Sequence, residues 1–510
     1  MLRIRTALGN LLLLLSALVS TASAAPDACP ANVQVMAGNA YRVSADGTIA
    51  KSIAPSFFGF NIEAPSFQLT LFDSATGQVL PQIIAYMQAF PGAVYRYPGG
   101  TVANFSNWEH GIGPLATRPY RAVVTWHAPM QDTFGFPEYL NFVAQVKGQA
   151  WLVPNLYGNL QGEKPTAKLA ASARAWAALA KQDQAKGMPG ILRWELGNEL
   201  YEGPTKWTPQ QYNKRALAVA AAIRSADDQA RLVVPLEEYT AQPGGMRYED
   251  YNTSLAQALA SYAPDYSQHF YVDGSTEVSL VPSTYNNLCQ NIGAIAAIGQ
   301  AGAGYWITEF ARAPLSWDNL NKSSWGRLSN MGSALSIADM LIGLSQIPQV
   351  KGAFLLGLAT TIGPWPLFYK NSAGVYRPTL PYWTLRILRE SLLSEVLTTY
   401  TQSANRSNYA GGYDLRASVL TDATHQHYAV WAVNRAGQAI DVQLHIPALA
   451  DRTLQANLTT LSSLSRDAAD DAAGESVLPA QTNFSMTFDS SGNGALKLPG
   501  YAVAVLRLGP

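Results

Sequence analysis

Three glutamates lie within the eleven residues RWELGNELYEG at positions 193–203, and Asn198 precedes the middle one, Glu199. A further glutamate, Glu309, lies near the end of the apolar run YWITEF. Carboxylates placed close together repel one another, so a chain with only 14% charged residues is expected to keep such a group for a purpose. Two carboxyl groups facing each other across about 5 Å suit cleavage of a glycosidic bond, because one protonates the leaving oxygen while the other attacks the sugar.

The three glutamates of the first stretch are expected to differ in role. Glu195 sits inside an apolar run and should be a structural acid paired with Arg96 or Arg193. Glu202 belongs to the following loop and should be solvated. Glu199 lies just beyond a glycine turn at the end of the run, so we predict that it faces the substrate and donates the proton.

Eight short apolar runs between residues 57 and 360 alternate with longer, alanine-rich segments of helical period. The runs are SFFGFNI, AVYRYPG, AWLVPNL, ILRWELG, RLVVP, DYSQHFYV, GYWITEF and KGAFLLGL. Near-continuous apolar strands between helices predict a parallel sheet buried on both faces. Eight such units predict an α/β fold, a (β/α)8 barrel over 57–393, whose strand ends would bring Glu199 and Glu309 to one mouth. A doubly wound open sheet is the alternative, but no glycine-rich dinucleotide turn supports it.

The pattern changes after residue 393 to alternating strands separated by Gly, Asn and Asp turns. These strands are YDLRASVL, HYAVWAVNR, AIDVQLHI, FSMTFD and YAVAVLRL. They predict a C-terminal antiparallel β-sandwich over residues 394–510, to which residues 25–56 are expected to add strands through VQVMAG and YRVSADG.

The first 24 residues have the pattern of a signal peptide, with two arginines, the apolar run NLLLLLSALVS and the small residues ASA. We therefore expect a secreted or periplasmic protein with no membrane association in its mature form; an uncleaved anchor is the alternative. Cys29 and Cys289 are the two cysteines, and the sequence leaves open whether they pair.

The balance of 35 basic and 35 acidic residues gives no attraction to nucleic acid. No phosphate loop, GxSxG or HExxH motif is present, so no cofactor and no metal are expected. The HQH at 425–427 is expected on a strand face, and Glu237 and Glu238 in a solvated loop. We expect a carbohydrate partner, and the oligomeric state stays open. Several aromatic residues are candidate platforms for the apolar faces of sugars: Trp108, Trp126, Tyr157, Trp207, Trp317 and Trp365.

Four motifs together resemble one family. RYPGGTVANFSNWEHGIGP, FGFPEYLNF, RWELGNELYEG and YWITEF are similar to the α-L-arabinofuranosidases (glycoside hydrolase family 51-like) of the retaining glycosidase clan with (β/α)8 barrels. The resemblance extends from FGFNIE at residue 58 to the last strand and implies hydrolysis of polysaccharide or oligosaccharide by double displacement.

The resemblance also implies residue roles. Glu199 would be the acid/base and Glu309 the nucleophile, kept ionised by Arg96. Asn198 would hydrogen-bond the sugar hydroxyl beside the anomeric carbon. Further sugar contacts would come from Glu63, His269 and Tyr271.

Two departures from the arabinofuranosidase pattern leave the sugar open: Thr101 after PGG, and the stretch ARAPLSW after Glu309, where those enzymes tend to carry an aromatic-rich segment. Thr101 stands after PGG where the arabinofuranosidases usually carry Asn. With threonine at this position, the motif resembles that of the heparanase and β-glucuronidase family (family 79-like). The glycine-rich segment that receives the uronate in that family is absent, although Lys206, Arg247 and Arg312 are candidate cations. A hydrolase of uronic-acid-containing glycans and a catalytically silent carbohydrate-binding protein are therefore the alternatives to an arabinofuranosidase-like hydrolase.

Overall fold

The computed structural model describes the chain from residue 32 onward with internal gaps. The described residues are 32–38, 40–64, 72–73, 75–122, 129–202, 205–237, 248–263, 265–273, 281–314, 326–358, 365–406, 412–469 and 477–510. The segment taken as a signal peptide lies outside them, as does Cys29, so the pairing of Cys29 with Cys289 stays a prediction.

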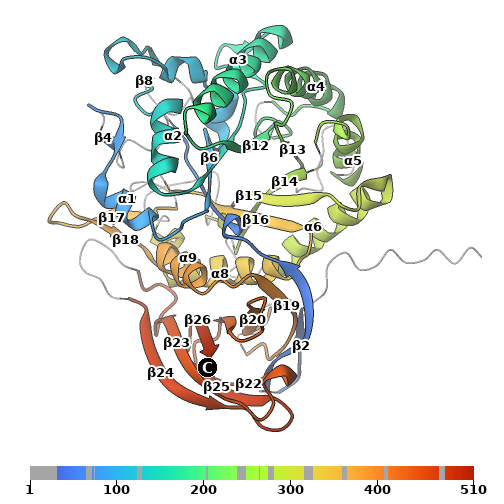
Figure 1. The fold of residues 1–510 in the computed structure, drawn as a ribbon, viewed down its shortest axis with the longest axis vertical. Helices are drawn as coiled ribbons and strands as arrows, with labels where there is room; N and C mark the ends of the chain where they lie inside the picture. The colour runs from blue at the N-terminus through green and yellow to red at the C-terminus, as the bar shows by residue number, and fades with distance from the viewer. Residues whose placement is uncertain are drawn as a thin grey trace, which may run out of the picture.

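Eight parallel strands close into a barrel, drawn in the upper part of Figure 1. In chain order they are β3 (Phe58–Asn61), β6 (Val94–Tyr97), β9 (Gln149–Leu152), β12 (Ile191–Glu195), β13 (Leu232–Pro235), β14 (Asp265–Val272), β15 (Gly304–Arg312) and β16 (Val350–Leu355). Each predicted apolar run overlaps one of these strands, and β16 pairs with β3 to close the ring. The predicted (β/α)8 barrel is confirmed.

Helices surround the barrel (Figure 1): α1 (Pro81–Met87), α2 (Phe136–Gln145), α3 (Thr166–Ala185), α4 (Pro209–Ala226), α5 (Tyr248–Leu259), α6 (Val281–Ile295), α8 (Met331–Ser345) and α9 (Leu380–Glu390). The start of α4 shows how the sequence sets a boundary. Thr208 accepts from the backbone N–H of Gln211, whose side chain accepts from the N–H of Thr208, and Pro209 occupies the first turn. No helix of the described residues is long and apolar enough to cross a bilayer.

Short elements fill the connections. The two-stranded pairs are β4 (Phe72–Asp73) with β5 (Gln78–Val79), β7 (Tyr120–Arg121) with β8 (Met130–Gln131), β10 (Gly158–Asn159) with β11 (Gly162–Glu163), and β17 (Phe368–Lys370) with β18 (Tyr376–Pro378). The single turns are η1 (Pro55–Phe57), η2 (Thr101–Asn104), η3 (Trp108–Gly111), η4 (Leu115–Thr117), η6 (Ala296–Gln300), η7 (Gly326–Leu328) and η8 (Pro447–Leu449).

The barrel interior is layered by polarity. Trp151, Trp306 and Phe354 pack against one another with ring centroids 5.1–5.9 Å apart and fill its lower part. Arg96 and Glu195 form a fully buried polar layer against this plug: Arg96 is the register partner of Trp151, whose indole N–H donates to Glu195. The apolar layer removes water from below the charges, which strengthens the interactions between them.

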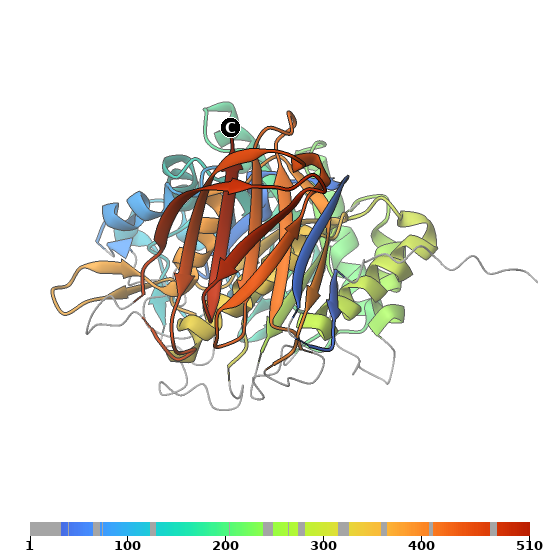
Figure 2. The ribbon, with the colours of Figure 1, turned by 90° about the horizontal axis from the view of Figure 1, so that it is seen from below.

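A second body lies below the barrel in Figure 1 and is seen face-on in Figure 2. Its strands are β1 (Val33–Val35), β2 (Tyr41–Ser52), β19 (Glu395–Ser403), β20 (Leu415–Thr421), β21 (Tyr428–Asn434), β22 (Ile440–His445), β23 (Thr453–Ser462), β24 (Ala480–Thr487), β25 (Asn493–Leu498) and β26 (Ala502–Gly509). Most pairings are antiparallel; β1 with β19 and β2 with β22 are parallel. This sheet is the predicted β-sandwich body, and β2 appears in Figure 2 as a blue strand among orange and red ones.

Alternation along β21 shows how the two bodies join. Trp431 and Val433 belong to the core shared with the barrel, whereas Val430 and Ala432 face the inner core of the sandwich. The indole N–H of Trp431 donates to Ser391 Oγ at the end of α9 (2.8 Å). One face of the sheet is thus fixed against the helices α8 and α9.

A buried ionic network also crosses this junction. Arg435, just after β21, donates to Asp273 at the end of β14 (2.7 Å) and to Asp339 on α8 (3.1 Å). Arg416 on β20 also donates to Asp339 (2.6 Å). Asp273 has a left-handed backbone (φ 55°), a conformation that these bonds to its side chain help to hold.

Candidate active site

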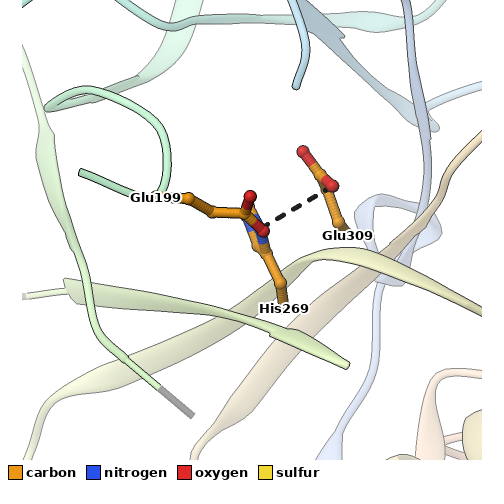
Figure 3. Close-up of side chains that lie close together, drawn as sticks. All are labelled: Glu199, His269 and Glu309. Carbon is orange, nitrogen blue, oxygen red and sulfur yellow. Dashed lines mark hydrogen bonds and ion pairs between the residues drawn. The ribbon is translucent and has the colours of Figure 1, made fainter. Parts of the chain in front are cut away.

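Glu199 and Glu309 meet at the mouth of the barrel, as predicted. Glu199 is in the loop after β12 and Glu309 lies within β15. One carboxylate oxygen of each, together with a ring nitrogen of His269, lies within 4.8 Å of the other two (Figure 3). This short gap between the two acids is nearer to the carboxyl separation of retaining glycosidases, about 5–5.5 Å, than to the roughly 6.5–9.5 Å of inverting ones.

The two acids differ in exposure. The side chain of Glu199 is 28% exposed, whereas that of Glu309 is 4% exposed. Glu199 also has a left-handed backbone (φ 44°), which follows the positive φ of Gly197. The strained turn aims an accessible carboxyl group at a buried one.

Glu309 is held by donors on both oxygens. Arg96 Nη1 donates to Oε1 (2.7 Å) and Tyr271 Oη donates to Oε2 (2.8 Å). Burial raises the pKa of Glu309, but the charges of His269 and Arg96 and these hydrogen bonds outweigh burial and leave the pKa below its ordinary value. Glu309 is therefore ionised at neutral pH, as a nucleophile requires.

Arg96 connects the site residues. Its Nε donates to Glu195 (2.5 Å), and its Nη2 donates to Asn198 Oδ1 (2.7 Å). Its Nη1 also donates to Asn61 Oδ1 (3.0 Å) in addition to Glu309. The rigid guanidinium thus fixes four side chains at once.

Glu195 is the structural acid that the sequence predicted. Its carboxylate is fully buried and accepts from Arg96, Trp151 Nε1 (3.0 Å), Ser267 Oγ (2.6 Å) and Thr308 Oγ1 (2.8 Å). With four donors already around it, Glu195 has no capacity left for a substrate.

His269 bridges the two acids. Its Nδ1 lies 2.6 Å from Glu199 Oε1 and 3.7 Å from Glu309 Oε2, and its Nε2 lies 3.1 Å from Thr308 Oγ1. Burial lowers the pKa of His269, but the charges of Glu309 and Glu199 outweigh burial and raise it. Both ring nitrogens have protein partners, so the expected sugar contact of His269 stays a prediction, and the side chain serves first to hold Glu199.

The side-chain amide of Asn198 keeps one donor without a partner among the described residues. Arg96 occupies its Oδ1, so Nδ2 points the other way, and this buried nitrogen has no hydrogen-bond partner among the described residues. The backbone of Asn198 is held on both sides by Asn104, which donates to its C=O (2.6 Å) and accepts from its N–H (3.3 Å). A buried amide donor kept open in this way is suited to a ligand hydroxyl.

Glu63 lies against the glycines of PGG. A Cβ at Gly100 would lie 1.6 Å from Glu63 Oε1, and Gly100 has φ 64°, so only glycine fits there. Burial and then the charge of Glu309 raise the pKa of Glu63 to about 8. Glu63 is therefore a neutral hydrogen-bond donor at neutral pH. Thr101, the departure from the family pattern, begins η2 directly after Gly100.

The aromatic platforms separate into three groups. Trp207 is a core residue whose indole N–H donates to Glu163 (3.0 Å). Trp108, Tyr157 and Trp365 are partly buried, and the ring of Trp365 lies 5.4 Å from that of Tyr271. The remaining two, Trp126 and Trp317, lie outside the described residues.

The sequence missed the residues that connect the acids. Thr308, Asn61 and Asn104 are absent from the predicted set, although Thr308 directly precedes Glu309. The expectation of a solvated Glu237 is wrong, since it is 3% exposed; Glu238 lies outside the described residues.

The three side chains in Figure 3 also have the ligand types of a cation site. The 2.6 Å contact of His269 with Glu199 is a hydrogen bond, and Arg96 already brings a cation to Glu309. The contact between His269 and Glu199 is therefore suited to proton transfer between these two side chains without a metal ion.

Comparison with known proteins agrees with the motifs. Residues 86–276 match the model of the alpha-L-arabinofuranosidase 1 domain. An exo-alpha-(1->6)-L-arabinofuranosidase from Bifidobacterium longum is 29% identical over 159 residues, which are 30% of this chain and 30% of that protein. An intracellular exo-alpha-(1->5)-L-arabinofuranosidase from Streptomyces lividans is 30% identical over 27% of this chain and 22% of its own length. These matches thus span under a third of either relative.

The fold extends the likeness to most of the chain. The alpha-L-arabinofuranosidase of Thermotoga maritima, solved with arabinose, covers 92% of this chain and 99% of its own with a TM-score of 0.74 at 16% identity. At that identity the likeness concerns the fold alone.

The relatives correct one prediction. The secreted or periplasmic location expected from residues 1–24 is wrong by this comparison, because the relatives from Streptomyces lividans, Bacillus subtilis and Halalkalibacterium halodurans are named intracellular enzymes. The expectation rested only on composition, a charged N-terminus followed by leucines. The residues that carry this pattern lie outside the described part of the chain.

The prediction of a glycoside hydrolase agrees with the names of these relatives. With the domain match at residues 86–276, the closed barrel and the sandwich, the resemblance of this chain to the α-L-arabinofuranosidases is confirmed.

Proposed function

We propose that this protein is a retaining glycosidase that releases terminal α-L-arabinofuranosyl groups from oligosaccharides or polysaccharides. The observation that carries the proposal is the convergence of one oxygen of Glu199 and one of Glu309 to within 4.8 Å. The names of the relatives support the choice of sugar, and those of the Bifidobacterium longum and Streptomyces lividans relatives support attack at chain ends.

In the first step a carboxylate oxygen of Glu309 attacks the anomeric carbon while the bond to the leaving oxygen breaks. The proton for that oxygen comes from Glu199, whose exposed side chain lies next to the buried nucleophile. The products of this step are a glycosyl ester on Glu309 and the free alcohol.

In the second step water enters where the alcohol has left. Glu199, now a carboxylate, accepts a proton from the water as its oxygen attacks the anomeric carbon, and Glu309 departs as a carboxylate. Arg96 and Tyr271, which donate to the two oxygens of Glu309, stabilise the charge that returns to it.

The sugar would be held by donors that are free in this structure. Asn198 Nδ2 would donate to the hydroxyl beside the anomeric carbon, where a bond strengthened in the transition state lowers the barrier. Neutral Glu63 would donate to, or accept from, a second hydroxyl.

The residues offered as cations for a uronate do not favour a uronidase. Arg312 is buried and donates to Asn330 Oδ1 and the C=O of Arg327. Lys206 is exposed, and Arg247 lies outside the described residues. Arg96 is committed to Glu195 and Glu309. A neutral pentose therefore suits the first subsite better than an acidic sugar.

The test is a panel of aryl glycosides that includes α-L-arabinofuranosides, β-D-glucuronides and β-D-glucosides. We expect turnover of the arabinofuranoside with retained anomeric configuration, read by proton NMR before the sugar mutarotates. Inverted product contradicts the double displacement. Sugar binding without cleavage of any member of the panel identifies a silent binding protein instead.

A further inference from the structure

A cavity of about 440 Å³ lies on the same face of the barrel as the two acids and includes neither of them. Pro98 and Asn155, which follow β6 and β9, line its base. Trp108 of η3 and the first turns of α3 form its walls. Its volume is within the roughly 300–1,000 Å³ range of small-molecule sites.

The cavity is built onto the backbone beside the proton donor. Asn104, at the end of η2, makes two hydrogen bonds with the backbone of Asn198, the residue before Glu199. Asn155 donates to the C=O of Ser106 in the same loop (2.7 Å) and so ties this loop to the end of β9. These hydrogen bonds fix the position of the wall that carries Trp108 relative to Glu199.

The position of the cavity defines what it would hold. In the barrel β9 lies between β6 and β12, the strand that leads to Glu199, whereas the nucleophile stands on β15, which pairs with β14 and β16. The leaving group departs on the side of the proton donor. A cavity on the Glu199 side is therefore placed for the sugar that departs, not for the one that is attacked.

The lining of the cavity suits a sugar ring. Trp108 packs one face on Trp176, with ring centroids 5.6 Å apart and planes 9° apart, and its indole N–H donates to Ser172 (3.1 Å). An indole fixed in this way provides a rigid aromatic surface in the cavity wall. Asn155 and Ser172 add polar groups to the same lining.

The lining also carries uncompensated positive charge. Lys164 and Lys168 both line the cavity, and neither ammonium group has an acidic partner within 4.0 Å in the described part of the chain. One acid, Glu109, lies in the same lining. Next to Glu109, the pKa of His110 is lowered by burial and then by the charges of Arg121 and Lys164, as expected where positive charge is in excess.

We propose that this cavity binds the first sugar of the leaving group and that this sugar carries a carboxylate, as a hexuronic acid does. The proposal rests on the proposed glycosidase function and adds its substrate class: a neutral arabinofuranose attached to an acidic glycan. Lys164 and Lys168 would pair with the uronate while Trp108 supports the ring.

The test compares kcat/KM for three arabinofuranosides, whose leaving groups are 4-nitrophenol, a neutral hexose and a hexuronic acid. We expect the uronic acid substrate to exceed the hexose substrate by roughly three- to tenfold at low ionic strength. The preference should shrink in about 0.5 M NaCl, because salt screens partly exposed charges.

The variant Lys164→Gln/Lys168→Gln should abolish this preference, so that kcat/KM becomes equal for the neutral hexose and the hexuronic acid substrates. Lys164→Glu/Lys168→Glu should reverse the preference. Lys214→Gln is the matched control, because Lys214 is an exposed lysine of α4 that does not line the cavity.

The outcomes separate the two proposals. Cleavage of the 4-nitrophenyl glycoside with equal kcat/KM for neutral and acidic leaving groups, or a preference unchanged in both lysine variants, overturns the acidic subsite and leaves the glycosidase intact. Failure to cleave any glycoside overturns both.

Discussion

His269 and Glu199 share one proton across 2.6 Å. Thr308 gives its hydroxyl hydrogen to Glu195, so its oxygen accepts from His269 Nε2, which must carry a hydrogen. If His269 is neutral, its Nδ1 is bare and Glu199 is the donor; if His269 is charged, Nδ1 donates to a carboxylate. Either way the pair holds a proton at the place where a leaving group needs one.

Replacing Thr308 by Val should therefore disturb proton delivery. The change removes the acceptor for His269 Nε2 and one donor to Glu195, and each buried group left unpaired costs about 1–3 kcal/mol. We expect kcat/KM on alkyl glycosides to fall more than on 4-nitrophenyl glycosides, with a shifted pH profile. Thr308→Ser, which keeps the hydroxyl, is the control. Equal losses on both substrate types would indicate a structural role alone.

Glu309→Gln should abolish turnover. The amide cannot form the glycosyl ester, and we expect a loss of about a thousandfold or more in kcat, measured with 4-nitrophenyl α-L-arabinofuranoside. Glu202→Gln, in the neighbouring loop, should stay near wild type. Residual activity within tenfold of wild type would remove Glu309 from the role of nucleophile.

Glu199→Ala should separate substrates by leaving group. A good leaving group needs no proton, so 4-nitrophenyl substrates should still form the ester, whereas alkyl glycosides should lose roughly 10²–10⁴-fold. Azide should restore turnover and yield a glycosyl azide, detected by mass spectrometry. A variant equally poor on every leaving group and unresponsive to azide would contradict the acid/base assignment.

Glu63 should limit activity and stability at alkaline pH. Its pKa of about 8 means that the carboxyl group is neutral below that pH and becomes a further negative charge beside Glu309 above it. Because this pKa exceeds the ordinary value of 4.5, the folded state holds the proton longer than the unfolded state. Its contribution to stability therefore falls as pH rises from about 4.5 to 8.

The Glu63→Gln variant tests both effects. In urea unfolding, the variant should lose less stability between pH 5 and pH 8 than wild type does. The alkaline limb of its kcat/KM profile should move to higher pH. An unchanged alkaline limb would assign that limb to another group.

Arg435→Met should destabilise the junction of barrel and sandwich. Methionine removes the guanidinium that pairs with the buried Asp273, at a cost of roughly 3–5 kcal/mol in urea unfolding. Burial raises the pKa of Asp273, but Arg435 and Ser336 outweigh burial and lower it, so the stabilisation from this pair should be lost as pH falls through the folded pKa. Arg231→Met, at an exposed position, should change stability little. A similar loss in both variants would contradict the role of the buried pair.

The barrel could be predicted because its strands are short, mostly apolar runs with glycine or proline nearby that separates them from the helical segments. β19 and β25 were not predicted from the sequence, because neither contains a continuous apolar run. β23 was not predicted either, because threonines interrupt the alternation of apolar and polar residues in LQANLTTLS. The two acids could be predicted from their motifs. The roles of Thr308 and Asn61 could not be predicted. Which side chains of β15 enter the barrel depends on a register shift between Ile307 and Phe310, and the sequence pattern does not reveal such a shift.

The pairing of β2 with β19 and β22 has a consequence for biosynthesis. β2 leaves the ribosome before any barrel strand, yet its partners are made only after the whole barrel has been translated. During that interval its ladder is an open template for other chains, so a nascent protein stalled within the barrel should be prone to intermolecular strand exchange and should depend on chaperones.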